Sequence, residues 1–484
     1  MHNNSHKKNR KVSGEYPVIL LYFGVYILIS LSLLFRQPFG NPPDEINRYL
    51  IPQFIARTGC LPNGYDEAVR IPSYGFSYAF QPILPYMIQG FAMGLVSFFT
   101  ESETILFYTA RFVDFLFGLV MAYYVLKLGR KWFHQKPFQY LFSFLVTFLP
   151  QAIFLHTYIN TDSCCMMSIA MMLYGLTLCL EDNFSYSSCT LMSVGIIFCA
   201  LSYYNAYGFI LSCILLFFAW HLKKGDSPQG QFHFAWKSCM KKGLFISTLV
   251  LLGISWWFIR SYLLYDGDFL GLRTRDLCGA LYGNENMKPG VRITYQSQGY
   301  SVLSMLLQSD FCVLSLNSLI AMYGPMIITT ARWIYRFYKA LLGGGFLFGL
   351  WAVIQKKEGP AGLEKRPLLR AFFHLNLLLC ILLPFLLSVI YSYKTDYQPQ
   401  GRYLMPMLIP LMYFVTCGIQ LLLDKVCALV KRKRGNGQQK RPASQDSVVF
   451  ALSVTGPCIL LILVILIALF VTVYGYAFPY YAAL

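Results

Sequence analysis

The chain has 484 residues, of which 56% are hydrophobic and 13% charged, and its formal net charge is +18. Soluble domains carry about 25% charged residues, so this composition excludes an ordinary soluble protein. The positive charge would suit a nucleic-acid partner, but the basic residues gather in short clusters between apolar blocks. Membrane proteins show that pattern in their cytoplasmic loops, so we expect membrane lipids and no nucleic acid among the partners.

Apolar blocks recur along the whole chain, and a long block can cross about 30 Å of hydrocarbon as a helix. The sequence therefore predicts an all-α integral membrane protein, a polytopic bundle of about 11 transmembrane helices. We expect residues 1–484 to form one membrane domain. The predicted spans, in chain order, are 16–35, 105–126, 138–156, 163–181, 187–203, 207–222, 243–262, 331–354, 371–392, 403–423 and 448–473.

The basic clusters predict how this bundle is oriented. Most of the 40 Lys and Arg residues lie at the N-terminus and in the loops around 127–136, 223–242, 356–370 and 425–441. The positive-inside rule places these segments in the cytoplasm, so the N-terminus is expected inside and the C-terminus outside the cell membrane. Two large loops, 36–104 and 263–330, are then external.

The apolar block 82–99 tests this topology. If it crossed the membrane, every later basic cluster would face outward, against the positive-inside rule. The block also contains two prolines and two glycines, which weaken it as a regular helix. We therefore predict an interfacial or half-inserted segment within the first outer loop.

The first outer loop carries the strongest candidate for chemistry. Two adjacent acids, Asp44 and Glu45, follow a Pro-Pro pair that stiffens the backbone, and a helix with Arg48 and Arg57 is expected after them. Carboxylates at the membrane surface can act as catalytic bases, while the arginines can bind a phosphate. Helix capping is the alternative for the two acids.

A second candidate site is the short outer turn from His156 to Asp162, which also contains Asn160. Asp162 lies at a predicted helix start, so capping is again the alternative. It is expected on the same membrane face as Asp44. Together the two acids can activate an acceptor hydroxyl, or hold a divalent cation such as Mg²⁺ or Mn²⁺ through oxygen ligands.

A third candidate site lies in the outer segment 393–403, which contains Lys394 and ends in Gly401-Arg402-Tyr403. We expect Gly401 to allow close backbone approach, and the helix start to offer free amides beside Arg402, a combination that suits a phosphate. Membrane anchoring by Arg402 and Tyr403 is the alternative. Further back in the chain, Arg111 and Asp114 are spaced as a structural ion pair that faces the bundle.

Four further short motifs follow one another along the chain. A Pro-x-x-Pro-Tyr segment follows the Pro-Asp-Glu motif, and an Ala-Arg helix start, a Gly-Arg-Lys turn and an Asn-x-Asp turn come after it. Here they are Pro82–Tyr86, Ala110-Arg111, Gly129–Lys131 and Asn160–Asp162. This order resembles the GT-C membrane glycosyltransferases, the group of protein O-mannosyltransferases and lipid A aminoarabinose transferases. Segment 400–406, Gln-Gly-Arg-Tyr-Leu-Met-Pro, resembles more specifically a bacterial branch of uncharacterised multi-pass proteins allied to that group.

The resemblance implies a GT-C-like fold and a transferase that moves a hexosyl or pentosyl group from a polyprenyl-phosphate donor. The acceptor would be an extracytoplasmic glycan, lipid or protein, as in cell-envelope polysaccharide biosynthesis. Asp44 would serve as base or metal-linked activator, Asp162 would support it, and basic residues near the outer surface would hold the donor phosphate.

Two other classes stay open at this stage. A transporter or flippase of a lipid-linked saccharide would concentrate ionisable residues in mid-helix and show two matching halves, which this sequence does not. A non-catalytic scaffold of a surface-polysaccharide assembly system would keep the fold without the activity.

Overall fold

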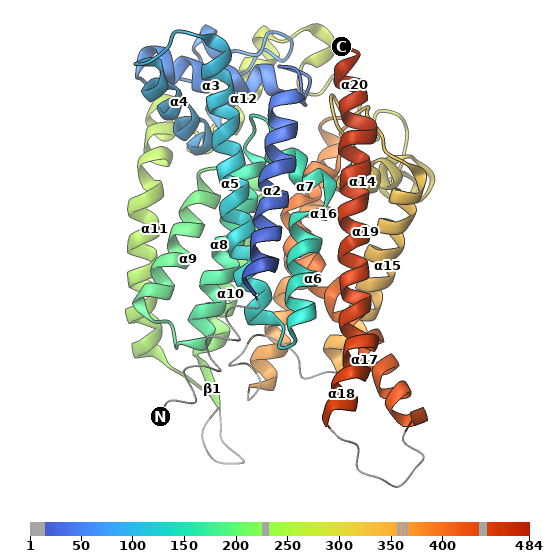
Figure 1. The fold of residues 1–484 in the computed structure, drawn as a ribbon. Helices are drawn as coiled ribbons and strands as arrows, with labels where there is room; N and C mark the ends of the chain where they lie inside the picture. Colours follow the sequence, from blue (N-terminus) through green and yellow to red (C-terminus); the bar gives the residue numbers. More distant parts are fainter. Residues whose placement is uncertain (1–14, 225–231, 356–359, 361–362, 364–365, 435–442) are drawn as a thin grey trace.

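The computed structural model describes residues 15–224, 232–355, 360, 363, 366–434 and 443–484. Within these ranges nine helical segments are long and apolar enough to cross a membrane. They pack side by side as one bundle (Figure 1). The segments are α2 (Tyr16–Arg36), α5 (Glu103–Trp132), α8 (Asp162–Glu181), α10 (Tyr207–His221) with η3 (Tyr204–Ala206), α11 (Trp236–Leu264), α15 (Arg332–Gln355), α16 (Pro367–Lys394), α17 (Leu408–Arg434) with η5 (Gly401–Met407), and the C-terminal run α18 to α20. That run comprises α18 (Ala443–Phe450), η6 (Ala451–Thr455), α19 (Gly456–Thr472), η7 (Val473–Ala477) and α20 (Phe478–Ala482).

The remaining two predicted spans are not long, uninterrupted helices. The block predicted at 138–156 is broken into α6 (Lys136–Thr147) and α7 (Pro150–Leu155). Pro150 causes the break, because a proline disfavours helical geometry in the residue before it, and Leu149 is extended. The block predicted at 187–203 is α9 (Tyr186–Ala200), an apolar helix of only 15 residues.

The two large loops lie together at one end of the bundle (Figure 1). The first contains α3 (Glu45–Thr58), η1 (Glu67–Val69), η2 (Tyr78–Phe80) and α4 (Leu84–Ser97). The second contains α12 (Leu272–Tyr282), η4 (Glu285–Met287), α13 (Val302–Gln308) and α14 (Phe311–Ile320), the last two bent by 59° against each other. The block predicted as interfacial is α4, which at 14 residues is too short to span and lies beside α3 at this end.

Backbone contacts hold the two loops against each other. The Asn284 amide donates to the Ser73 carbonyl, and the Gly64 amide donates to the Tyr265 hydroxyl. Gly75 has a left-handed φ of +72°, and a Cβ there would lie 2.1 Å from the Gly283 nitrogen. Only glycine accommodates both that conformation and that contact, so the loops share one packed layer over the bundle.

The buried fraction of each helix indicates whether it lies at the centre or at the outside of the bundle. α8 is almost wholly buried, whereas α11 is exposed along nearly its whole length, as expected of a lipid-facing helix. α2 begins at the opposite end of the bundle from the one at which α20 ends (Figure 1). A short hairpin, β1 (Leu222–Lys224) and β2 (Phe232–Phe234), pairs Lys223 with His233 at the end where α2 begins.

The two large loops lie at the same end of the bundle (Figure 1), as the distribution of the basic clusters predicted. The basic N-terminal segment and parts of the inner loops at 356–365 and 435–442 lie outside the described residues.

Candidate active site

Asp44 occupies an unusual backbone position directly after Pro42-Pro43. Its φ is +61°, in the left-handed region that non-glycine residues rarely adopt, and it is the N-cap residue of α3. Its side chain makes no capping hydrogen bond. Instead, Oδ2 of Asp44 accepts a 2.7 Å hydrogen bond from Nη2 of Arg402. The strained turn therefore directs this carboxylate to a distant part of the chain.

Arg48 lies between Asp44 and Asp162. Its Nη2 is 3.7 Å from Oδ2 of Asp44, and its Nη1 is 3.5 Å from Oδ2 of Asp162. We call Asp44, Arg48, Asp162 and Arg402 the charged cluster. Three of its side chains are at most 7% exposed, but that of Asp44 is 26% exposed. Asp44 is thus the member that solvent or an acceptor can reach.

The charged cluster keeps Asp44 ionised. Burial by itself would raise the pKa of Asp44, but the positive charges of Arg402 and Arg48 outweigh that effect and hold the pKa below its ordinary value of 3.8. Asp44 therefore carries a full negative charge at neutral pH.

Several polar atoms of the charged cluster lack hydrogen-bond partners among the described residues. They are Nε and Nη1 of Arg48, Nε and Nη1 of Arg402, and both carboxylate oxygens of Asp162. Buried polar groups in native proteins are nearly always hydrogen-bonded, and an unsatisfied guanidinium N–H is costly. The same absence shows that Asp162, like Asp44, is not a helix cap. Unpaired buried donors of this kind suit an anionic ligand.

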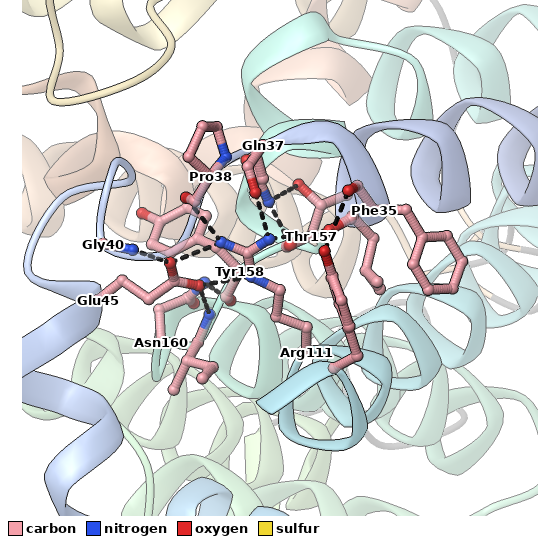
Figure 2. Close-up of polar contacts among 12 residues, drawn as sticks. Phe35, Gln37, Pro38, Gly40, Glu45, Arg111, Thr157, Tyr158 and Asn160 are labelled. Atoms are coloured by element: carbon pink, nitrogen blue, oxygen red, sulfur yellow. Dashed lines mark hydrogen bonds and ion pairs between the residues drawn. The ribbon is translucent and has the colours of Figure 1, made fainter. Parts of the chain in front are cut away.

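Glu45, one residue from Asp44, has a different environment (Figure 2). Its side chain is fully buried and forms two hydrogen bonds with Arg111, from Nε at 2.7 Å and from Nη2 at 2.6 Å. It also accepts from the amides of Gly40 and Ile159. Arg111 in turn donates to the carbonyls of Leu34, Gln37 and Pro38. This pair joins the first loop to α5 and to the turn before α8.

The pair expected between Arg111 and Asp114 does not form, because Arg111 bonds Glu45 instead. Asp114 is buried in α5, where its Oδ2 accepts a 2.7 Å hydrogen bond from Nε2 of Gln89 on α4. Spacing along one helix indicated the wrong partner, since the first loop folds back over the end of α5.

The Asn-x-Asp turn is held by its own side chains. Nδ2 of Asn160 donates to the carbonyls of Leu155 and Tyr158, and its Oδ1 accepts from the Ser163 amide. His156 is fully buried and shares a 2.6 Å hydrogen bond with Ser163. Both residues therefore fix the start of α8, where Asp162 lies.

Two predicted phosphate ligands lie outside the charged cluster. Arg57 is 61% exposed and pairs with Glu103 at 2.6 Å. Lys394 is exposed at the end of α16. Tyr403, in contrast, contacts the cluster, because Nη2 of Arg402 lies 3.3 Å from its hydroxyl.

Gly401 has a packing role that differs from the one expected. A Cβ there would lie 2.0 Å from the Leu319 nitrogen, and the Gly401 amide donates to the Ser318 hydroxyl. The close approach is therefore to α14, and this amide is not free for a phosphate.

The geometry of the charged cluster tests whether Asp44 and Asp162 can hold the expected divalent cation. No group of three or more His, Cys, Asp or Glu side chains suited to a metal occurs in the described part of the chain. Asp44 and Asp162 are separated by the Arg48 guanidinium, which stands where an ion shared by the two acids would stand. The two acids as arranged do not fit a shared metal ion.

Sequence reasoning missed several residues around the charged cluster. Arg48 lies over the ring of Tyr78, 5.5 Å from its centroid, and Asp396 and Gln398 continue the polar contacts beyond Tyr403. Asp396 and Gln398 belong to the segment 393–403 that the sequence singled out, whereas Tyr78 had no distinguishing signal in a tyrosine-rich stretch.

Comparison with solved structures identifies the fold. ArnT from Cupriavidus metallidurans, solved bound to undecaprenyl phosphate, aligns with a TM-score of 0.52 and 11% identity over 96% of this chain and 74% of its own. The oligosaccharyltransferase of Archaeoglobus fulgidus, tethered with an acceptor peptide, aligns with a TM-score of 0.50 and 14% identity over 92% of this chain. No family model and no curated protein matches.

These likenesses show that the chain shares the fold of the two enzymes, so the expected GT-C-like fold is confirmed. The chain spans 55% of the oligosaccharyltransferase's length. Identities of this size establish the fold and leave the reaction to be argued from the residues.

Proposed function

We propose that this protein transfers a sugar from a polyprenyl-phosphate-linked donor to an extracytoplasmic acceptor. The observation that carries the proposal is the pair of buried arginines, Arg48 and Arg402, whose unpartnered N–H groups adjoin the ionised and partly exposed Asp44. The fold supports it, since the ArnT structure with this architecture contains undecaprenyl phosphate.

The arginines are the proposed donor-phosphate ligands. Among the described residues, Nε of both arginines and Nη1 of Arg402 have no hydrogen-bond partner, while Nη1 of Arg48 has only the 3.5 Å contact with Asp162, and phosphate oxygens can accept from such N–H groups. Arg57 and Lys394, both exposed and outside the charged cluster, are not assigned this role.

Asp44 is the proposed catalytic base. As the acceptor oxygen bonds to the anomeric carbon, the bond from that carbon to the phosphate oxygen breaks and polyprenyl phosphate departs. The acceptor hydroxyl loses its proton to the Asp44 carboxylate. Asp162, held by the turn before α8, orients Arg48 in this scheme. The buried Glu45 stabilises the first loop through Arg111 rather than taking part in chemistry.

We also propose that the end of the bundle with the two large loops faces away from the cytoplasm. The basic clusters of the opposite end support this orientation. Cysteine labelling from outside intact cells should modify a cysteine placed at the exposed Leu484, and should not modify one placed at Lys223. The reverse labelling pattern would contradict the orientation.

The transfer reaction itself is tested with Asp44→Asn. Asparagine tolerates the left-handed backbone and Asp44 makes no cap, so the variant should fold like the wild type. We expect sugar transfer from polyprenyl-phosphate donors to cell-envelope acceptors to fall about a hundredfold. Glu101→Gln, which removes an exposed carboxylate at the same end of the molecule, is the matched control and should retain full activity. Equal rates in Asp44→Asn and the wild type would refute the mechanism.

A further inference from the structure

A row of polar side chains leads away from the charged cluster. Arg402 contacts the Tyr403 hydroxyl, which lies 3.5 Å from Oε1 of Gln398. Nε2 of Gln398 is 3.4 Å from Oδ2 of Asp396, and Nη1 of Arg292 is 3.9 Å from the same oxygen. The row therefore connects Asp44 to Arg292, a residue of the other large loop.

The backbone positions this row beyond the end of α16. That helix ends at Lys394, and η5 re-enters the bundle at Gly401, so Asp396 and Gln398 lie in the external turn between them. The Tyr397 amide donates to the Ile293 carbonyl, which brings Arg292 beside Asp396. The row thus leads from the charged cluster to the turn between α16 and η5.

The contacts within the row are long for hydrogen bonds, and its polar groups can form further hydrogen bonds to a ligand. Nε2 of Gln400 donates a hydrogen bond to Gln398, whereas Oε1 of Gln400 is buried and has no partner among the described residues. A nearby carboxylate shows the contrast, because both oxygens of Asp310 accept short tyrosine hydrogen bonds, from Tyr295 at 2.6 Å and Tyr397 at 2.7 Å. The contacts of Asp396 with Gln398 and Arg292 are longer, at 3.4 Å and 3.9 Å. Burial raises the pKa of Asp396 even though Arg292 acts in the opposite direction.

Aromatic rings border the same row. The Arg292 guanidinium lies 4.9 Å from the ring centroid of Tyr74, and the rings of Tyr391 and Tyr403 are 5.8 Å apart. Burial and then the charges of Asp396 and Asp44 raise the pKa of Tyr74. Binding sites for small polar ligands combine aromatic walls with a few polar groups in this way.

We propose that Arg292, Asp396, Gln398 and Gln400 form the subsite that binds the hydroxyl groups of a glycan acceptor of the reaction at Asp44. The inference rests on the proposed function and narrows its acceptor class to a saccharide. Neighbouring sugar hydroxyls both donate and accept, which matches an acceptor-only carboxylate, a donor-only guanidinium and two amides that do both. The tyrosine rings would cover the apolar face of the sugar.

The test is direct binding by the full-length protein in lipid nanodiscs. The probe is a set of oligosaccharides released by mild acid from the surface polysaccharides of the cells that make the protein, with binding followed by saturation-transfer NMR. We expect the wild type to bind members of this set, and Asp396→Asn and Arg292→Gln to bind them at least tenfold more weakly. Binding of undecaprenyl phosphate, measured on the same samples, should change less than twofold in both variants.

Controls separate the subsite from folding and from the donor site. Glu101→Gln should bind oligosaccharides like the wild type, and unchanged melting temperatures should show that the variants fold. Absence of oligosaccharide binding by the wild type, or equal binding by the variants, would overturn the subsite. If undecaprenyl phosphate still bound, the proposed function would stand without it. A loss of undecaprenyl phosphate binding in Asp396→Asn would assign the row to the donor and would also overturn the inference.

Discussion

Asp44 and Arg402 are 358 residues apart in the chain, yet a 2.7 Å hydrogen bond joins Oδ2 of the one to Nη2 of the other. One comes from the turn before α3 and the other from η5, which packs against α14 through Gly401. The contact brings the more exposed acid of the charged cluster beside a buried cation. It exists only when the first outer loop and the last third of the chain are packed together.

Replacing Arg402 with lysine should weaken donor binding far more than folding. Lysine keeps the positive charge near Asp44 but lacks the planar fork that matches two phosphate oxygens. We expect the dissociation constant for undecaprenyl phosphate to rise about tenfold or more, which corresponds to the loss of one charge-assisted hydrogen bond. Native mass spectrometry of the detergent-solubilised protein measures it. Arg332→Lys changes an exposed arginine at the start of α15 and is the matched control. Equal affinities of Arg402→Lys and the wild type would limit Arg402 to a structural role.

Breaking the Glu45–Arg111 pair should lower the stability of the folded protein, because the pair has a structural role and takes no part in the reaction. Both side chains are fully buried, and Arg111→Gln leaves the Glu45 charge without its cation. We expect a loss of about 3 kcal/mol or more in the free energy of unfolding, seen as a lower thermal midpoint. The double variant Glu45→Gln/Arg111→Gln leaves no unpaired charge and should recover part of that loss. A thermal midpoint of Arg111→Gln equal to that of the wild type would contradict this role.

The pH dependence of transfer should report the ionisation of Asp44. Its folded-state pKa is lowered below 3.8, so the ionised form persists on acidification and is lost only as the pH falls through that lowered value. We expect kcat/KM to show no acid limb from Asp44 between pH 7 and pH 4. In Arg402→Gln the burial of Asp44 is opposed by Arg48 alone, so the limb should move to higher pH. An acid limb above pH 5 in the wild type would require another group.

Chelation should leave transfer unaffected. The guanidinium of Arg48 separates Asp44 from Asp162, and these acids as arranged do not share a metal ion. We expect EDTA treatment followed by Mg²⁺ or Mn²⁺ addition to change the initial rate less than twofold. A rate that falls at least tenfold with EDTA and returns with one cation would establish a metal requirement and would call for a rearrangement of Arg48.

Composition and residue order were enough to predict the membrane class and the fold, because hydrophobic block length and the distribution of charge follow from the bilayer itself. They also placed Asp44, Asp162 and Arg402 among the candidates. The spacing of residues along the chain did not predict which charged side chains pair with each other. Only the tertiary structure pairs Arg111 with Glu45 rather than Asp114, sets Arg48 between two acids, and leaves Arg57 exposed. The physical reason is that burial and charge neutralisation act between segments far apart in the chain, and the packing of the two outer loops decides which segments meet.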